Sequence, residues 1–110
     1  MNTFTINGTK YKAKPFDFNL ICDLEDMGIS LEQARNKPIS MVRAYVGLCA
    51  GKDKEYAGKE LEAHIISGGK FDDVMIAMSE EMEKSDFFRK LNKTAETENT
   101  KNPATESEKE

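Results

Sequence analysis

The chain has 110 residues, of which 38% are hydrophobic and 33% charged, and a formal net charge of −4. This length supports one domain with a modest core. No apolar run approaches the roughly 20 residues of a spanning helix, so we expect no membrane segment. Lysines alternate with acids and form no basic stripe, which argues against nucleic-acid partners and anionic membranes.

The N-terminus lacks the basic and apolar stretches of a secretory signal, and Cys22 and Cys49 are isolated. We therefore expect a cytoplasmic protein with buried free thiols.

A β-hairpin is predicted at the N-terminus. Residues 3–6 and 9–13 alternate polar and apolar side chains on either side of Asn7-Gly8. Asn-Gly favours a type I′ turn, which requires positive φ at both central residues. A lone hairpin is marginal, so its apolar face must pack on helices. In this register that face carries Phe4, Ile6, Tyr11 and Ala13.

Short amphipathic helices are predicted after the hairpin. The first runs from a cap at Asp17 to Met27, and the second opens with a capping box of Ser30 and Gln33. A third extends from a cap at Ser40 through Ala50. The fourth starts at Asp53 or Gly58 and ends at Gly68-Gly69. The side chains that the fourth helix should turn inward are Leu61, Ile65 and Ile66.

The last part of the domain is also predicted to be helical. A fifth helix begins with a cap at Asp72, and Phe71 and Ile76 are spaced for a hydrophobic staple. Ser85-Asp86 indicates a new cap or a kink before a short apolar segment. We therefore predict an α+β fold, predominantly α, with an N-terminal β-hairpin followed by five or six short helices.

Residues 93–110 form a separate segment by composition. They contain no Val, Ile, Leu, Met or aromatic residue. Such a segment cannot bury enough apolar surface to offset the entropy of ordering. We therefore divide the chain into a domain at 1–92 and a disordered acidic tail at 93–110.

No catalytic, cofactor or metal site is predicted. His64 has no recognisable partners for nucleophilic catalysis, and a structural or surface role is expected for it. The acidic clusters occupy polar helix faces or helix N-termini, where carboxylates suit solvent and the helix dipole. Residues 28–34 have a weak likeness to the start of a helix-turn-helix, but the largely apolar 40–45 that follows is unsuited to reading bases.

One apolar stripe near the end of the domain has two interpretations. Methionines at spacings of three and four ordinarily pack into a core, but they also form adaptable contact surfaces for partners. Two adjacent aromatics follow, and they cannot point the same way, so we expect one to be partly exposed. The candidate protein-binding residues are Met75, Met78, Met82, Phe87, Phe88 and Leu91.

The whole pattern over about residues 1–92 resembles a family of phage proteins. The opening TFTINGTKYKAKPFDF at 3–18, NLICDLEDMG at 19–28 and GKDKEYAGKELEAHII at 51–66 carry the resemblance, together with SDFFRKL at 85–91 before a polar tail. These segments are similar to tail assembly chaperones of long-tailed, siphovirus-type phages and prophages of Gram-positive bacteria.

The resemblance implies a non-enzymatic virion morphogenesis factor. Such chaperones bind the tape measure protein, recruit tail tube subunits around it in the host cytoplasm, and are absent from the mature virion. The family has no catalytic residues to transfer to this chain. A homo-oligomer stays open, because the hairpin has a free edge. The alternative function is an intracellular adaptor or an antitoxin-like protein-binding module, and a small enzyme ranks below both.

Overall fold

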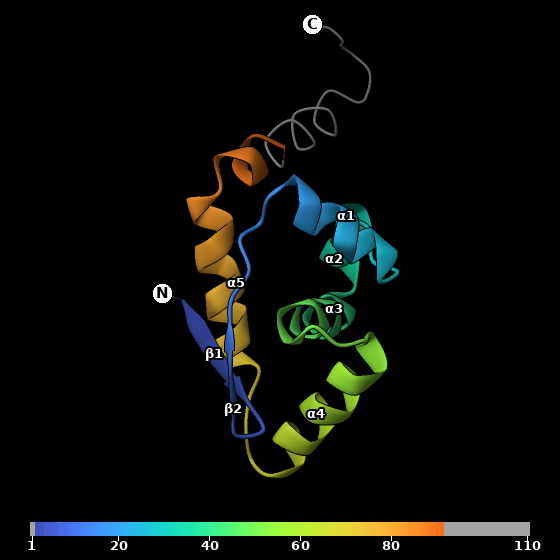
Figure 1. Ribbon diagram of the computed structural model, residues 1–110, viewed down its shortest axis with the longest axis vertical. Coiled ribbons are helices and arrows are strands. Elements are labelled where there is room, and N and C mark those ends of the chain that lie inside the picture. The colour runs from blue at the N-terminus through green and yellow to red at the C-terminus, as the bar shows by residue number, and fades with distance from the viewer. Residues whose placement is uncertain (1, 92–110) are drawn as a thin grey trace, which may run out of the picture.

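A computed structural model of the protein describes residues 2–91, and Figure 1 shows an N-terminal hairpin lying alongside a layer of helices. The predicted α+β class, predominantly α, is confirmed. A further helical segment covers residues 86–91, and the predicted tail at 93–110 lies outside the described residues. The elements are β1 (Thr3–Ile6), β2 (Thr9–Lys12), α1 (Phe18–Asp26), α2 (Leu31–Asn36), α3 (Pro38–Ala50), α4 (Lys54–Ile66) and α5 (Asp72–Lys84).

The hairpin has the predicted register. β1 and β2 pair antiparallel with Phe4 opposite Tyr11. Asn7 and Gly8 have φ of 51° and 82°, the positive values that a type I′ turn requires. Phe4 and Ile6 are buried, and β1 packs against both α5 and α4. The two strands thus depend on the helices for their stability, as expected of an isolated hairpin.

Local capping determines where α1 and α2 begin. The Asp17 carboxylate accepts a hydrogen bond from the backbone N–H of Leu20 at 2.8 Å. Ser30 Oγ accepts from the Gln33 N–H at 3.2 Å, and Gln33 Oε1 accepts from the Ser30 N–H at 2.9 Å. Both predicted caps are therefore confirmed, and each satisfies N–H groups that a helix start leaves unpaired.

The predicted start of α3 is wrong. The helix begins at Pro38, two residues before Ser40, and Lys37 at the N-cap makes no side-chain cap. Proline suits this position because its ring fixes φ near the helical value and the first turn has no use for its missing N–H. For α4, Asp53 is the cap and Gly58 is not, since the Asp53 carboxylate accepts from the Tyr56 N–H at 2.8 Å.

The predicted inward face of α4 is wrong in part. Leu61 is buried, but Ile65 is exposed and Ile66 is 78% exposed. The inward stripe runs through Ala57, Leu61 and then His64, because the side of α4 next to His64 meets the hairpin turn. The i, i+4, i+7 spacing is kept with a polar residue at its last position.

The prediction for the start of α5 is wrong, and the prediction of a new cap after its end is confirmed. Phe71 is itself the N-cap residue, in place of Asp72, and Ile76 is 58% exposed, so the predicted staple is wrong. Ser85 does cap the next helical segment, because its Oγ accepts from the Phe88 N–H at 3.0 Å. The same hydroxyl donates to the carbonyl oxygen of Phe16. Ser85 therefore links the end of α5 to the segment before α1.

His64 has a structural role. Its Nδ1 accepts a hydrogen bond from the backbone N–H of Asn7 at 2.9 Å, so Nε2 carries the proton and donates to the Lys70 carbonyl at 3.0 Å. The imidazole thus joins the hairpin turn, α4 and the loop before α5. Gly69 packs directly on the ring, since a Cβ placed there would lie 2.4 Å from the imidazole Cε1.

Tyr45 lies at the centre of the core. Its side chain is fully buried, and its hydroxyl donates to the Lys14 carbonyl at 2.7 Å. The Phe16 ring stacks on it with centroids 5.3 Å apart, and Phe4 packs beside it at 6.1 Å.

Burial raises the pKa of the Tyr45 hydroxyl and, less strongly, that of the neighbouring Cys49 thiol. Cys49 and Cys22 are free, as predicted, but half-buried rather than fully buried.

Replacing Tyr45 with Phe tests the central hydrogen bond. Tyr45→Phe should lower the free energy of unfolding at neutral pH by about 1 kcal/mol, because the buried Lys14 carbonyl loses its donor. A raised folded-state pKa means that the protonated hydroxyl stabilises the fold below the ordinary pKa of about 10 and that this stability is lost as pH rises above it. Urea denaturation across this range should therefore show a smaller alkaline loss in Tyr45→Phe than in the wild type. An equal alkaline loss of stability in both proteins would show that the Tyr45 hydroxyl is not its cause.

Replacing Gly69 with Ala tests the contact with His64. Gly69 does not have a positive φ, so an alanine costs stability only by displacing the imidazole. We expect a loss of about 1–3 kcal/mol, typical of overpacking. In a His64→Ala background the same change should cost much less, and a double-mutant cycle measured by urea denaturation reports the difference. Additive effects would show that the two residues are not coupled.

Candidate protein-binding grooves

Two apolar grooves border the N-terminal half of α3. The first, which we call the methionine groove, has a volume of about 290 Å³ and lies between α2, α3, α5 and the segment 86–91. Four of the six predicted binding residues line it, namely Met75, Met78, Met82 and Phe88. The other lining residues are Leu31, Ala34, Arg35, Pro38 and Met41.

The methionines of this groove differ in exposure. Met78 is buried, Met82 is half-buried and Met75 is 43% exposed. The core interpretation of the stripe is therefore confirmed for Met78, and the contact-surface interpretation stays a prediction for Met75. Met78 belongs to the core, and Met75 presents a flexible thioether side chain at the groove mouth. Phe88 forms part of the wall and rests edge-on against Phe16, with ring centroids 5.3 Å apart.

Two predicted binding residues do not line the methionine groove. Phe87 turns away from it and meets Phe18 edge-on, with centroids 5.8 Å apart. The expectation that the adjacent aromatics diverge is confirmed, since Phe88 is buried and Phe87 is exposed. Leu91 is half-buried and is not among the lining residues.

Sequence reasoning missed the wall that α2 contributes to the methionine groove. Leu31 and Ala34 are three residues apart on α2, which is the usual spacing of a helical face. That spacing was a usable signal for an apolar face. Nothing local, however, indicates that this face lies opposite α5, because the two helices are about 40 residues apart in the chain.

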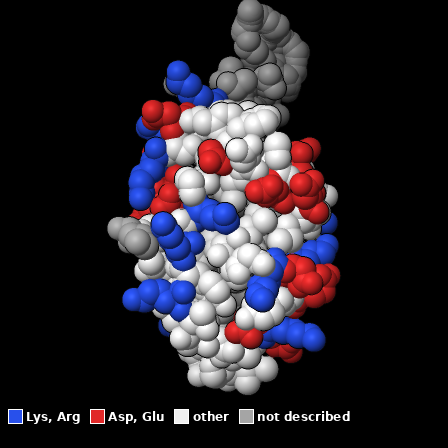
Figure 2. Space-filling model, in the orientation of Figure 1, with Lys and Arg blue, Asp and Glu red and all other residues white. Residues whose placement is uncertain are grey.

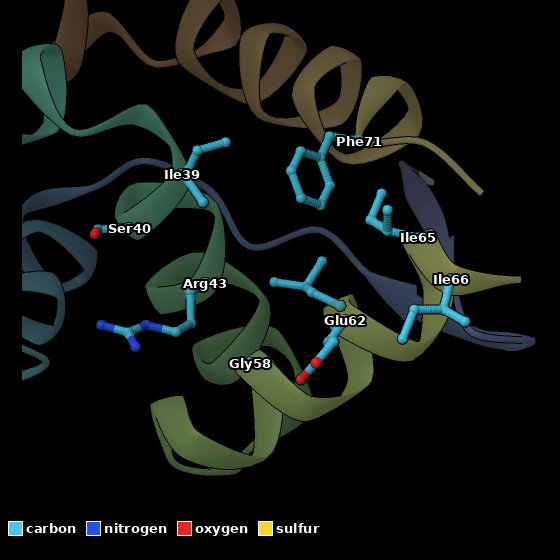
Figure 3. Close-up of a pocket in the computed structure, with 9 residues that line it drawn as sticks. Ile39, Ser40, Arg43, Gly58, Glu62, Ile65, Ile66 and Phe71 are labelled. Atoms are coloured by element: carbon cyan, nitrogen blue, oxygen red, sulfur yellow. The ribbon is translucent and has the colours of Figure 1, made fainter. Parts of the chain in front are cut away.

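The second groove, which we call the isoleucine groove, lies between α3 and α4. It has a volume of about 450 Å³. Figure 3 shows Ile39 and Phe71 on one side and, at the far end, Ile65 and Ile66, which are neighbours at the end of α4. The complete lining comprises Ile39, Ser40, Arg43, Gly58, Leu61, Glu62, Ile65, Ile66 and Phe71.

Charged side chains are mixed in sign on the face of the molecule that Figure 2 shows. Figure 2 shows uncharged atoms over much of the centre and the lower end of one face, with both signs interspersed around them. Glu81 differs from the other acids because it is buried. Its carboxylate accepts from Asn2 Nδ2 at 3.0 Å and pairs with Lys84 Nζ at 3.2 Å. This carboxylate therefore anchors the start of the chain to α5.

The described residues hold no cluster suited to a metal. Within residues 2–91, no three His, Cys, Asp or Glu side chains are arranged to bind an ion. In the same range, no helix combines the length and apolar character needed to cross a bilayer. Each of the two grooves offers an apolar surface to a partner.

Comparison with known proteins assigns no relative. No protein-family model, no curated protein and no solved structure matches the chain.

Aspartate substitutions at two methionines test which one is core. Met78→Asp should lower the free energy of unfolding by at least about 3 kcal/mol, because it buries an unpaired charge. Met75→Asp should change it by no more than about 0.5 kcal/mol, as expected for an exposed position. Thermal and urea unfolding followed by circular dichroism measure both. Similar losses in the two variants would show that Met75 is also core.

Proposed function

We propose that this protein is a non-enzymatic tail assembly chaperone of a long-tailed phage or prophage. In this role it binds the tape measure protein and recruits tail tube subunits in the host cytoplasm, and it leaves before the virion is mature. The proposal rests on the resemblance of residues 1–92 to this family and on the methionine groove. The groove is the observation that carries it, because a chaperone for apolar helices needs a surface that accepts varied side chains.

The chemistry of the methionine groove suits an amphipathic helix as ligand. Such a helix binds by laying its apolar face into a groove. Met75 and Met82 are unbranched and partly exposed, so they can repack around different side chains. The buried Met78 and Phe88 hold the groove in shape beneath them. A rigid base with adaptable edges favours moderate affinity for many similar segments of one long partner.

The charge of the chain supports the same role. A net charge of −4 and interspersed surface charges oppose non-specific association. A protein that holds aggregation-prone helices benefits from such an exterior. Residues 93–110 are polar in composition, with five glutamates against three lysines.

Coexpression with a tape measure protein tests the proposal. The wild type should keep the tape measure protein soluble and copurify with it. Met75→Asp should weaken this capture at least about tenfold, because a carboxylate at the groove mouth is desolvated by an apolar helix. Ile76→Asp is the matched control, since Ile76 is the next residue of α5 and 58% exposed but does not line the groove. This control should capture as well as the wild type.

Two results would contradict the proposal. The first is an insoluble tape measure protein with nothing copurifying with the wild type. The second is equal capture by Met75→Asp, Ile76→Asp and the wild type, which would place the interface elsewhere. Copurification with the product of a neighbouring toxin gene would favour the antitoxin-like alternative.

A further inference from the structure

The isoleucine groove is a second open apolar surface, separate from the methionine groove. Ile39 is 60% exposed at its α3 side, and Ile66 is 78% exposed at the end of α4. Leu61 lines the groove between them and is buried. Large apolar side chains that gather at one exposed hollow mark an interaction site, whereas scattered ones are ordinary. The surface thus combines a projecting side chain, Ile66, with a hollow beside it.

The groove also carries one charge of each sign. Arg43 comes from α3 and Glu62 from α4, on opposite sides of the hollow (Figure 3). The Arg43 stem lies against α4, because a Cβ at Gly58 would be 3.4 Å from Arg43 Cδ. Neither charged group takes part in the ion pairs or side-chain hydrogen bonds found within residues 2–91. Each is therefore available to an opposite charge from another molecule.

The composition of residues 93–110 does not suit this groove. Residues 93–110 contain no Val, Ile, Leu, Met or aromatic residue, so they offer no large side chain for an apolar hollow. A second molecule is therefore the better source of an apolar occupant. This surface holds both a projection and a hollow, and both signs of charge, which are the elements that a self-complementary two-fold contact needs.

We propose that two copies of this protein associate through their isoleucine grooves. Ile66 of each copy enters the groove of the other, and Arg43 of each copy faces Glu62 of the other. Two-fold symmetry then produces two identical ion pairs at the rim of an apolar contact. Each copy contributes only one groove and the end of one helix to the interface. The buried area is therefore small, and the fraction of dimer depends on protein concentration.

Charge reversal tests this arrangement, with sedimentation of the full chain as the measurement. The wild type should show a monomer–dimer equilibrium. Arg43→Glu places two pairs of acids across the two-fold axis, and Glu62→Arg places two pairs of arginines there. Each variant alone should dimerise at least about tenfold more weakly. An equimolar mixture of the two should recover dimers, because one copy then carries two acids and the other two arginines, which makes two attractive pairs.

Controls keep the result specific to the groove. Lys12→Glu on β2 and Glu25→Arg on α1 reverse exposed charges outside the groove and should sediment as the wild type does. Circular dichroism verifies that each variant is folded. A wild type that stays monomeric at all concentrations overturns the proposal, and so does a mixture that associates no better than its components. No tape measure protein is present, so these outcomes are independent of the capture experiment.

Discussion

The Tyr45 ring and its hydroxyl hold together parts of the chain that are far apart in the sequence. The hydroxyl donates to the Lys14 carbonyl and so fixes the segment between β2 and α1 against α3. Phe16 from that segment stacks on the ring, and Phe4 from β1 packs beside it. Phe88, near the other end of the described chain, rests on Phe16. Two regions thus pack on Tyr45 of α3, and a third joins them through Phe16. Without its acceptor, the buried Tyr45 hydroxyl would be costly.

The methionine groove depends on this cluster, because one of its walls is part of it. Phe88 lines the groove and contacts Phe16, and Ser85 bonds the Phe16 carbonyl at the start of the same helical segment. The groove is thus positioned by the core rather than by a loop. α3 belongs to both grooves, since Met41 lines the first and Arg43 the second. Residues two apart on a helix point about 160° away from each other, which places the grooves on different sides of α3.

Local chemistry made part of the fold predictable from the sequence. The turn at Asn7-Gly8 and the caps at Asp17 and Ser30 depend on residues within three positions, and all three were predicted correctly. The errors arose where contacts with distant segments determine which side of a helix is buried. Ile66 is exposed because His64 faces the hairpin turn, and nothing near α4 in the chain indicates that. For the same reason, spacing alone could not separate the buried Met78 from the exposed Met75, since both fit one helical stripe.

The two proposals reinforce each other through geometry. Because the grooves occupy different sides of α3, a dimer formed through the isoleucine grooves leaves both methionine grooves unoccupied. Two such grooves on one particle can bind successive apolar segments of a long helical partner, and the second binding event is then intramolecular. Linked sites raise the overall affinity without any new contact, provided that both can engage at once. A weak groove on each copy therefore suffices for firm capture of a long partner, while each single contact remains easy to release.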